Sequence, residues 1–208
     1  MSNPVPATLY RIAAVAGCGS AAVLLLNAAK RAELIPSSSF TQLVAPVAEI
    51  LALALVTALY FAFGRRTGTF GLIAYGLNAF ALTSLVGVEF VINLVFKKLP
   101  GATVQELRAG SLGIALTVAS LLFLIGTLSF VAAMLRSREL PTVPLVLYAV
   151  GAIPVALRAF APEGVLDLGL AVLAVGIGWL ALSLFNRSSH IAPWTTTTAP
   201  PLRHHSAV

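Results

Sequence analysis

Six long apolar segments dominate this chain and constrain its fold more than any other feature. A helix needs about 20 mainly apolar residues to cross the hydrocarbon core of a bilayer. The qualifying segments cover residues 9–29, 40–63, 69–96, 111–135, 142–160 and 164–185. Because open sheet edges cannot satisfy their backbone groups in lipid, we expect an all-α integral membrane bundle of six transmembrane helices.

The composition agrees with this expectation. Of the 208 residues, 59% are hydrophobic and only 10% are charged, whereas a soluble domain is about 45–50% apolar and about 25% charged. The solvent of such a chain must be largely lipid, so the lipid bilayer is the expected partner and nucleic acid is not. Residues 1–186 are expected to form the membrane domain, and the polar segment 187–208 is expected to be disordered.

The positions of the cations predict how the chain is oriented in the cell membrane. Six spans place both termini on one side, where the sequence has seven cations: Arg11, Arg65, Arg66, Arg136, Arg138, Arg187 and Arg203. The other side has five, or six with Arg158: Lys30, Arg31, Lys97, Lys98 and Arg108. Because Lys and Arg near span ends favour the cytoplasm, we expect both termini to be cytoplasmic.

Several kinds of site are excluded by the residues that the apolar segments lack. The three histidines, His190, His204 and His205, all follow the last segment, and Cys18 is the only cysteine. Intramembrane haem, zinc and Ser-His sites need histidine ligands or bases within the bundle. We therefore expect no metal and no cofactor.

Polar residues within the segments are the candidates for a functional site. A charged side chain at the bilayer centre costs about 2.5–3.5 kcal/mol on insertion scales, so it usually faces protein or water and has a partner. Glu49 lies nine residues after Phe40, or about 14 Å along a helix. Glu89 lies seven residues before Phe96, or about 11 Å from the same membrane face. Both glutamates therefore belong to one leaflet, which is the outer one in the expected orientation.

The remaining candidates lie near the same face. Asn93 follows Glu89 by one helical turn, and Arg158 and Asp167 flank a tight turn at 161–163 that could bring them within pairing distance. We predict an outward-facing polar half-cavity, formed by the second, third, fifth and sixth helices, with these five residues as ligand-binding candidates and no catalytic residue assigned. Simpler explanations stay open: Arg158 can snorkel, Asp167 can stabilise a helix N-terminus, and either glutamate can be a structural, protonated residue.

Short motifs resemble those of a bacterial membrane family. Arg-Ile-Ala-Ala at 11–14, Glu49 followed by Ala-Leu-Tyr at 58–60, Arg-Glu-Leu-Pro at 138–141 and Asp-Leu-Gly-Leu-Ala at 167–171 carry the resemblance. Over about residues 10–186 the chain resembles the six-helix family called "domain of unknown function 4386". The resemblance implies a six-helix fold and no established chemistry.

Three functions remain open from the sequence. The favoured one is binding or permeation of a small cationic or amphipathic solute, with Glu49 and Glu89 as counter-charges. An accessory or structural subunit of a membrane complex is the alternative, and a homodimer or larger complex would enlarge this small scaffold. The least favoured is a membrane enzyme that uses the two carboxylates as acid and base on a lipid or isoprenoid.

Overall fold

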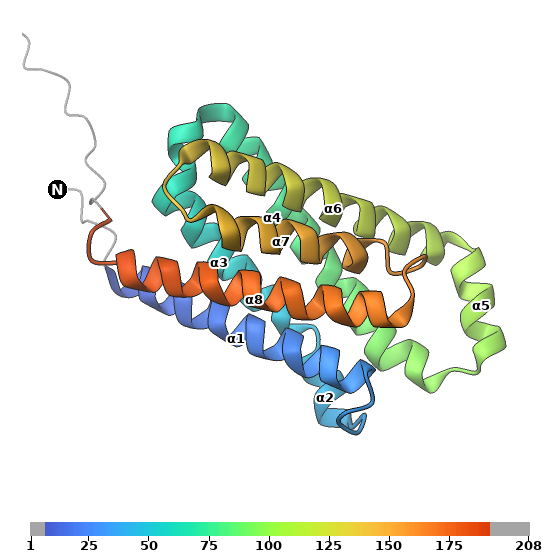
Figure 1. The fold of residues 1–208 in the computed structure, drawn as a ribbon. Coiled ribbons are helices and arrows are strands. Elements are labelled where there is room, and N and C mark those ends of the chain that lie inside the picture. The colour runs from blue at the N-terminus through green and yellow to red at the C-terminus, as the bar shows by residue number, and fades with distance from the viewer. Residues whose placement is uncertain (1–6, 192–208) are drawn as a thin grey trace, which may run out of the picture.

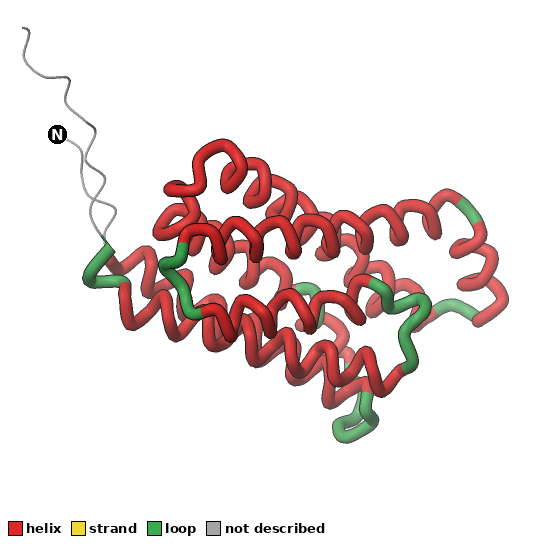
Figure 2. The backbone as a smooth tube through the Cα atoms, turned by 45° about the horizontal axis from the view of Figure 1, so that its top comes forward, coloured by secondary structure: helices red, strands yellow, loops and turns green. Residues whose placement is uncertain are grey.

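The computed structural model describes residues 7–191, which form a bundle of helices (Figure 1). The described residues contain no strand, and their loops are short and lie at the ends of the helices (Figure 2). The long helices are α1 (Ala7–Arg31), α3 (Val47–Phe63), α4 (Gly68–Phe90), α6 (Ser111–Ser137), α7 (Thr142–Ala156) and α8 (Glu163–Arg187).

These long helices form a closed ring. Each packs beside the one that follows it in the chain, in the opposite direction, and α8 returns to pack against α1 (Figure 1). We call the end with the start of α1, the end of α8 and the turns at 64–67 and 138–141 the terminal end. The other end, with the connections at 32–38, 97–110 and 157–162, is the distal end.

Most of the long helices have the length and the apolar composition that crossing a membrane requires. Four stretches are long and apolar enough to cross one: Ala7–Arg31, Ser39–Lys98, Ser111–Ser137 and Glu163–Arg187. Helix α7 is apolar but shorter, with 15 residues. Large apolar side chains are exposed on the outer faces of the helices, for example Ile12, Phe80, Ile114 and Leu168. The structure is thus consistent with a membrane protein.

The 60-residue stretch Ser39–Lys98 is divided into separate helices. A 3₁₀ turn at Gly64–Thr67 reverses the chain, so that α3 and α4 lie side by side. A second division, not expected from the sequence, lies at Ala45–Pro46 and separates the short helix α2 (Ser39–Val44) from α3. Proline lacks an N–H and clashes with the carbonyl four residues before it, which breaks a helix. The expected second helix at 40–63 is therefore two helices.

The distal connections also differ from the expectation. Helix α4 continues into a π-helical turn at Val91–Val95 and a 3₁₀ turn at Phe96–Lys98. The segment 97–110, expected as a loop, contains the exposed helix α5 (Gly101–Ala109). At the other boundary α7 ends at Ala156, four residues earlier than expected, so Arg158 lies in a turn outside the helix.

The start of the C-terminal polar segment packs against the bundle. Arg187 is the last residue of α8, and the guanidinium of Arg11 donates a hydrogen bond to the buried hydroxyl of Ser188 at 3.2 Å. This contact ties the end of α8 to the start of α1. The predicted disorder of the later residues 192–208 lies outside the described residues.

Close helix contacts in the ring depend on glycine. An ideal Cβ atom at Gly151 of α7 would lie 2.4 Å from the backbone nitrogen of Leu173 in α8, and one at Gly126 of α6 would lie 2.9 Å from the Cα of Asn78 in α4. Small residues permit such close approach of membrane helices. The atoms that a larger residue would meet at both positions belong to the backbone of the neighbouring helix.

We expect Gly151→Ala to destabilise the bundle by about 1–3 kcal/mol, because a methyl group there meets backbone atoms that cannot move aside. The matched control is Gly76→Ala, since a Cβ at Gly76 has no neighbour within 4 Å. The control should be neutral or slightly stabilising, because alanine favours a helix over glycine. Thermal unfolding in detergent measures both, and equal stability of the two variants would contradict the close α7–α8 packing.

Candidate ligand-binding site

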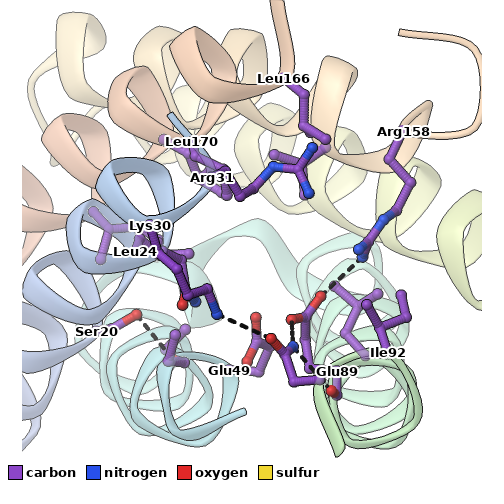
Figure 3. A pocket seen from close by; sticks show the side chains of 18 of the residues that line it. Ser20, Leu24, Lys30, Arg31, Glu49, Glu89, Ile92, Arg158, Leu166 and Leu170 are labelled. Atoms are coloured by element: carbon purple, nitrogen blue, oxygen red, sulfur yellow. Dashed lines mark hydrogen bonds and ion pairs between the residues drawn. The ribbon is translucent and has the colours of Figure 1, made fainter. Parts of the chain in front are cut away.

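A cavity of about 540 Å³ lies inside the ring and opens at the distal end (Figure 3). All six long helices contribute to its lining, so it occupies the lumen of the ring and not a groove on its outside. Examples from the six helices in chain order are Ser20, Glu49, Glu89, Phe123, Tyr148 and Leu170. Its volume is within the range of about 300–1,000 Å³ that is usual for small-molecule sites.

A network of polar side chains crosses the lumen near its opening (Figure 3). The guanidinium of Arg158 donates to Oε1 of Glu89 at 2.8 Å, and Nδ2 of Asn93 donates to Oε2 of the same carboxylate at 2.8 Å. Nζ of Lys30 in turn donates to Oδ1 of Asn93 at 3.0 Å. We call these four residues the lumen network. It joins the ends of α1, α4 and α7, three helices that are not neighbours in the ring.

The change of helix type after α4 helps to position Asn93. The side-chain amide of Asn93 donates a second hydrogen bond, of 3.0 Å, to the backbone carbonyl of Glu89, where the α-helix gives way to the π turn. Single π turns inside helices occur frequently at functional sites. Here the turn holds both Glu89 and Asn93 on the wall of the cavity.

Glu49 lies deep in the bundle although it is in the first turn of its helix. The hydroxyl of Ser20 donates to the carbonyl of Ala48 at 2.8 Å, which puts the start of α3 level with Ser20. Ser20 lies ten residues before Lys30, or about 15 Å along α1. Helix α3 therefore begins inside the ring, at the break around Pro46. The positive end of its dipole favours a carboxylate in this position.

Two acceptors in the cavity lining lack a hydrogen-bond partner. Oε2 of Glu49 and Oδ1 of Asn27 are both buried, and no donor in the described part of the chain reaches them. Asn27, on α1, is only 8% exposed. A buried polar atom left without a partner costs about 1–3 kcal/mol. A ligand with hydrogen-bond donors would relieve this cost for both residues.

The far end of the cavity is closed by a second polar cluster and then by apolar residues. Tyr148 lines the cavity, and its hydroxyl accepts a hydrogen bond of 3.3 Å from the buried Asn78. Thr127 donates to Oδ1 of Asn78 at 3.2 Å. Beyond this cluster the lumen is filled by fully buried side chains, among them Phe130 and Met134. The cavity is therefore blind toward the terminal end.

Four of the five predicted site residues line this one cavity: Glu49, Glu89, Asn93 and Arg158. Asp167 does not. Its Oδ1 accepts a hydrogen bond from Nε of Arg31 at 3.2 Å, an ion pair between α1 and α8. The expected pairing of Arg158 with Asp167 is replaced, because α7 ends early and Arg158 reaches the carboxylate of Glu89.

Helix α1 adds a wall to the cavity that was not expected from the sequence. Lys30 and Arg31, expected to lie in a connection, are the last residues of α1 and line the opening of the cavity. The helix stops sharply after them. Glu33 adopts the left-handed conformation with φ 58°, and the N–H of Leu34 donates back to the carbonyl of Ala29 at 2.9 Å. Ser20 and Asn27 are seven residues apart and so lie on one face of the helix. This spacing could have predicted that α1 lines the cavity.

Acidic residues are concentrated at the distal end. All seven lie within the described range, and only Glu139 is at the terminal end, where it contacts Arg66 and Arg187. The other six lie at or near the distal end, in the lining, in the Arg31–Asp167 pair or on α5. The distal end thus has mixed charge, whereas the terminal end is strongly basic.

Comparison with known proteins identifies no relative: no family model, curated protein or solved structure matches the chain. The resemblance to "domain of unknown function 4386" stays a prediction. The geometry of the cavity is therefore the basis for assigning a function.

We expect a double-mutant cycle of Glu89→Gln and Arg158→Gln to give a coupling energy of about 1–3 kcal/mol, measured by unfolding in detergent. Their side chains are only 17% and 25% exposed, so either charge left alone is poorly solvated. The control cycle is Glu139→Gln with Arg66→Gln, a pair whose side chains are 32% and 74% exposed. Exposed pairs typically contribute about 0–1 kcal/mol. Equal coupling in the two cycles would show that the lumen network adds no more than a surface ion pair.

Proposed function

We propose that this chain is a six-span membrane protein that binds a small amphipathic cation in the lumen of its helix ring. The observation that supports this most is the pair of partnerless acceptors, Oε2 of Glu49 and Oδ1 of Asn27, in the lining of one cavity. A cation with N–H groups offers donors to both oxygens and a positive charge to the carboxylate. Charge-assisted hydrogen bonds of this kind are roughly twice as strong as neutral ones.

The deeper part of the same cavity favours an apolar group. Its walls include Leu82 and Leu85 of α4, Phe123 of α6, and Leu173 and Ile177 of α8. Burying apolar surface against such side chains contributes about 25 cal/mol per Å². A ligand with one cationic end and one apolar end therefore matches the lining from its opening to its floor.

Binding is favoured over free passage by the closed floor. Fully buried side chains, such as Phe130, Met134 and Leu145, fill the lumen between the cavity and the terminal end. A solute could cross only if these helices changed their packing. The proposal is therefore a binding site that opens on one side of the membrane.

We place the distal end outside the cell and both termini in the cytoplasm. Of the 13 Lys and Arg in the sequence, seven belong to the side of both termini and six, with Arg158, to the other side. Cytoplasmic loops carry the excess of Lys and Arg.

We expect octylamine to bind the wild-type protein in nanodiscs and to bind Glu49→Gln about 10- to 100-fold more weakly, because the variant loses a charge-assisted hydrogen bond worth about 1.5–3 kcal/mol. Isothermal titration calorimetry, with empty nanodiscs as the blank, measures the affinities. The matched control is Glu106→Gln on the exposed helix α5, which removes the same charge outside the lining. Equal affinity of all three proteins would contradict the proposed site.

The six-span topology and its orientation are tested by labelling single cysteines. In a Cys18→Ser background, we expect Gln105→Cys in α5 to react with a membrane-impermeant maleimide in intact cells. Thr142→Cys at the start of α7 should react only after the cells are permeabilised. The opposite pattern would reverse the orientation, and reaction of both positions in intact cells would contradict six spans.

A further inference from the structure

We propose that the ligand is a straight-chain primary amine, bound with its ammonium group at Glu49 and Asn27 and its hydrocarbon chain along the lumen toward Phe123. This inference rests on the proposed function and narrows it to one chemical class. It also assigns the length of the chain and the direction in which it lies.

The head group must supply hydrogen-bond donors to more than one helix. The partnerless oxygens belong to α1 and α3, and the hydroxyl of Ser20 on α1, which donates to Ala48, still has lone pairs to offer. A primary ammonium carries three N–H donors, as the lysine side chain does. A quaternary ammonium has none, and proteins bind it instead with the faces of aromatic rings. The described lining has two aromatic residues, Phe123 and Tyr148, and both lie at the deep end.

The distal end already binds an ammonium group of the protein itself, that of Lys30. Nζ of Lys30 donates to Oδ1 of Asn93 at 3.0 Å and to the carbonyl of Thr41 at 3.5 Å. The charge of Glu89 lies close enough to interact with it. Amide, carbonyl and carboxylate oxygens in this part of the ring thus hold a primary ammonium. Asn27 lies one turn before Lys30 on α1, and its Oδ1 and Oε2 of Glu49 line the same cavity without a donor.

The space for the hydrocarbon chain follows the axis of the ring. Leu166, Leu170, Leu173 and Ile177 lie four, three and four residues apart, and so form one apolar stripe along α8 that faces the cavity. From Leu166 to Ile177 this stripe covers eleven residues, or about 16 Å along α8. An extended chain advances about 1.2 Å per bond, so a chain of eight bonds, about 10 Å long, fits along the stripe.

Chain length should therefore decide affinity. From butylamine to octylamine we expect affinity to rise about fourfold for each added methylene, as each one is buried in the apolar part of the lumen. Beyond octylamine the gain should stop, because the Tyr148–Asn78–Thr127 cluster closes the floor. Simple partitioning into lipid would instead continue to increase with length, in wild-type and variant proteins alike.

Two substitutions on α3 distinguish the lumen from the outside of the ring. Ala52 is buried and lines the cavity one turn after Glu49, whereas Ala54 is exposed and lines an apolar groove between α1 and α3 on the outer surface. Ala52→Leu adds three carbon atoms to the lining. We therefore expect the amine length at which affinity stops rising to fall by two to three carbons, about one carbon for each methylene-sized group added. Ala54→Leu should leave the length dependence as it is in the wild type.

The closing experiment measures a series of n-alkylamines on wild type, Ala52→Leu, Ala54→Leu and Glu49→Gln in nanodiscs, together with octyltrimethylammonium on the wild type. The last comparison needs no variant, so it decides the head-group question even if Ala52→Leu fails to fold. We expect octyltrimethylammonium to bind at least tenfold more weakly than octylamine. If Ala54→Leu changed the dependence of affinity on amine chain length, the ligand would lie in the outer groove, and this inference would be overturned.

The outcomes separate this inference from the function on which it rests. If octyltrimethylammonium binds as well as octylamine and both need Glu49, the lumen binds amphipathic cations but the primary-amine assignment is wrong. If affinity needs Glu49 but shows no limit in chain length, the assigned path of the chain is wrong. If no amine shows a dependence on Glu49, the proposed function itself fails.

Discussion

Charged side chains cannot face the hydrocarbon of a bilayer without partners, and the closed ring of helices meets this constraint by turning them toward its lumen. Glu89 is the centre of the arrangement, since its two carboxylate oxygens accept hydrogen bonds from Arg158 and Asn93, and Asn93 accepts one from Lys30. These residues come from the ends of three helices that are not neighbours, so the lumen network links three sides of the distal opening. The apolar outer faces and the polar distal part of the lumen are two consequences of the same requirement.

Two interruptions of regular helix shape the cavity. The break at Pro46 lets α3 begin inside the bundle with Glu49 in its first turn, and the π turn after α4 holds Asn93 against the backbone of Glu89. Non-helical backbone at membrane depth is tolerated only where protein or a water-filled cavity surrounds it. The π turn contains Ile92 and Asn93, which line the lumen, and the break at Pro46 comes shortly before Ala48 and Glu49, which line it too. By contrast, the α7–α8 contact is regular and tight, because glycines such as Gly151 allow the backbones to approach.

The sequence predicted more of the fold than of the site. Long apolar segments separated by short polar connections indicate helices, because the cost of leaving backbone groups unsatisfied in lipid leaves few alternatives. The described residues are indeed helical without a strand, and four of their helical stretches are long and apolar enough to cross a membrane. The shared depth of Glu49 and Glu89 predicted that they approach one cavity, and they do. The partner of Arg158 could not be predicted, since it depends on where α7 ends, and a difference of four residues changes the partner from Asp167 to Glu89. The role of Lys30 in the lumen was not predicted, because in the sequence a cation in the last turn of a helix looks the same as a cation in a loop.

The central claim is that the lumen holds an amphipathic cation with its charge at Glu49 and its apolar end toward Phe123. The most direct test is an X-ray structure of the full chain grown with an octylamine that carries bromine on its terminal carbon. We expect an anomalous bromine peak in the deep part of the cavity, near Phe123 and Ile177. A bromine peak at the distal opening, or in the outer groove beside Ala54, would contradict it.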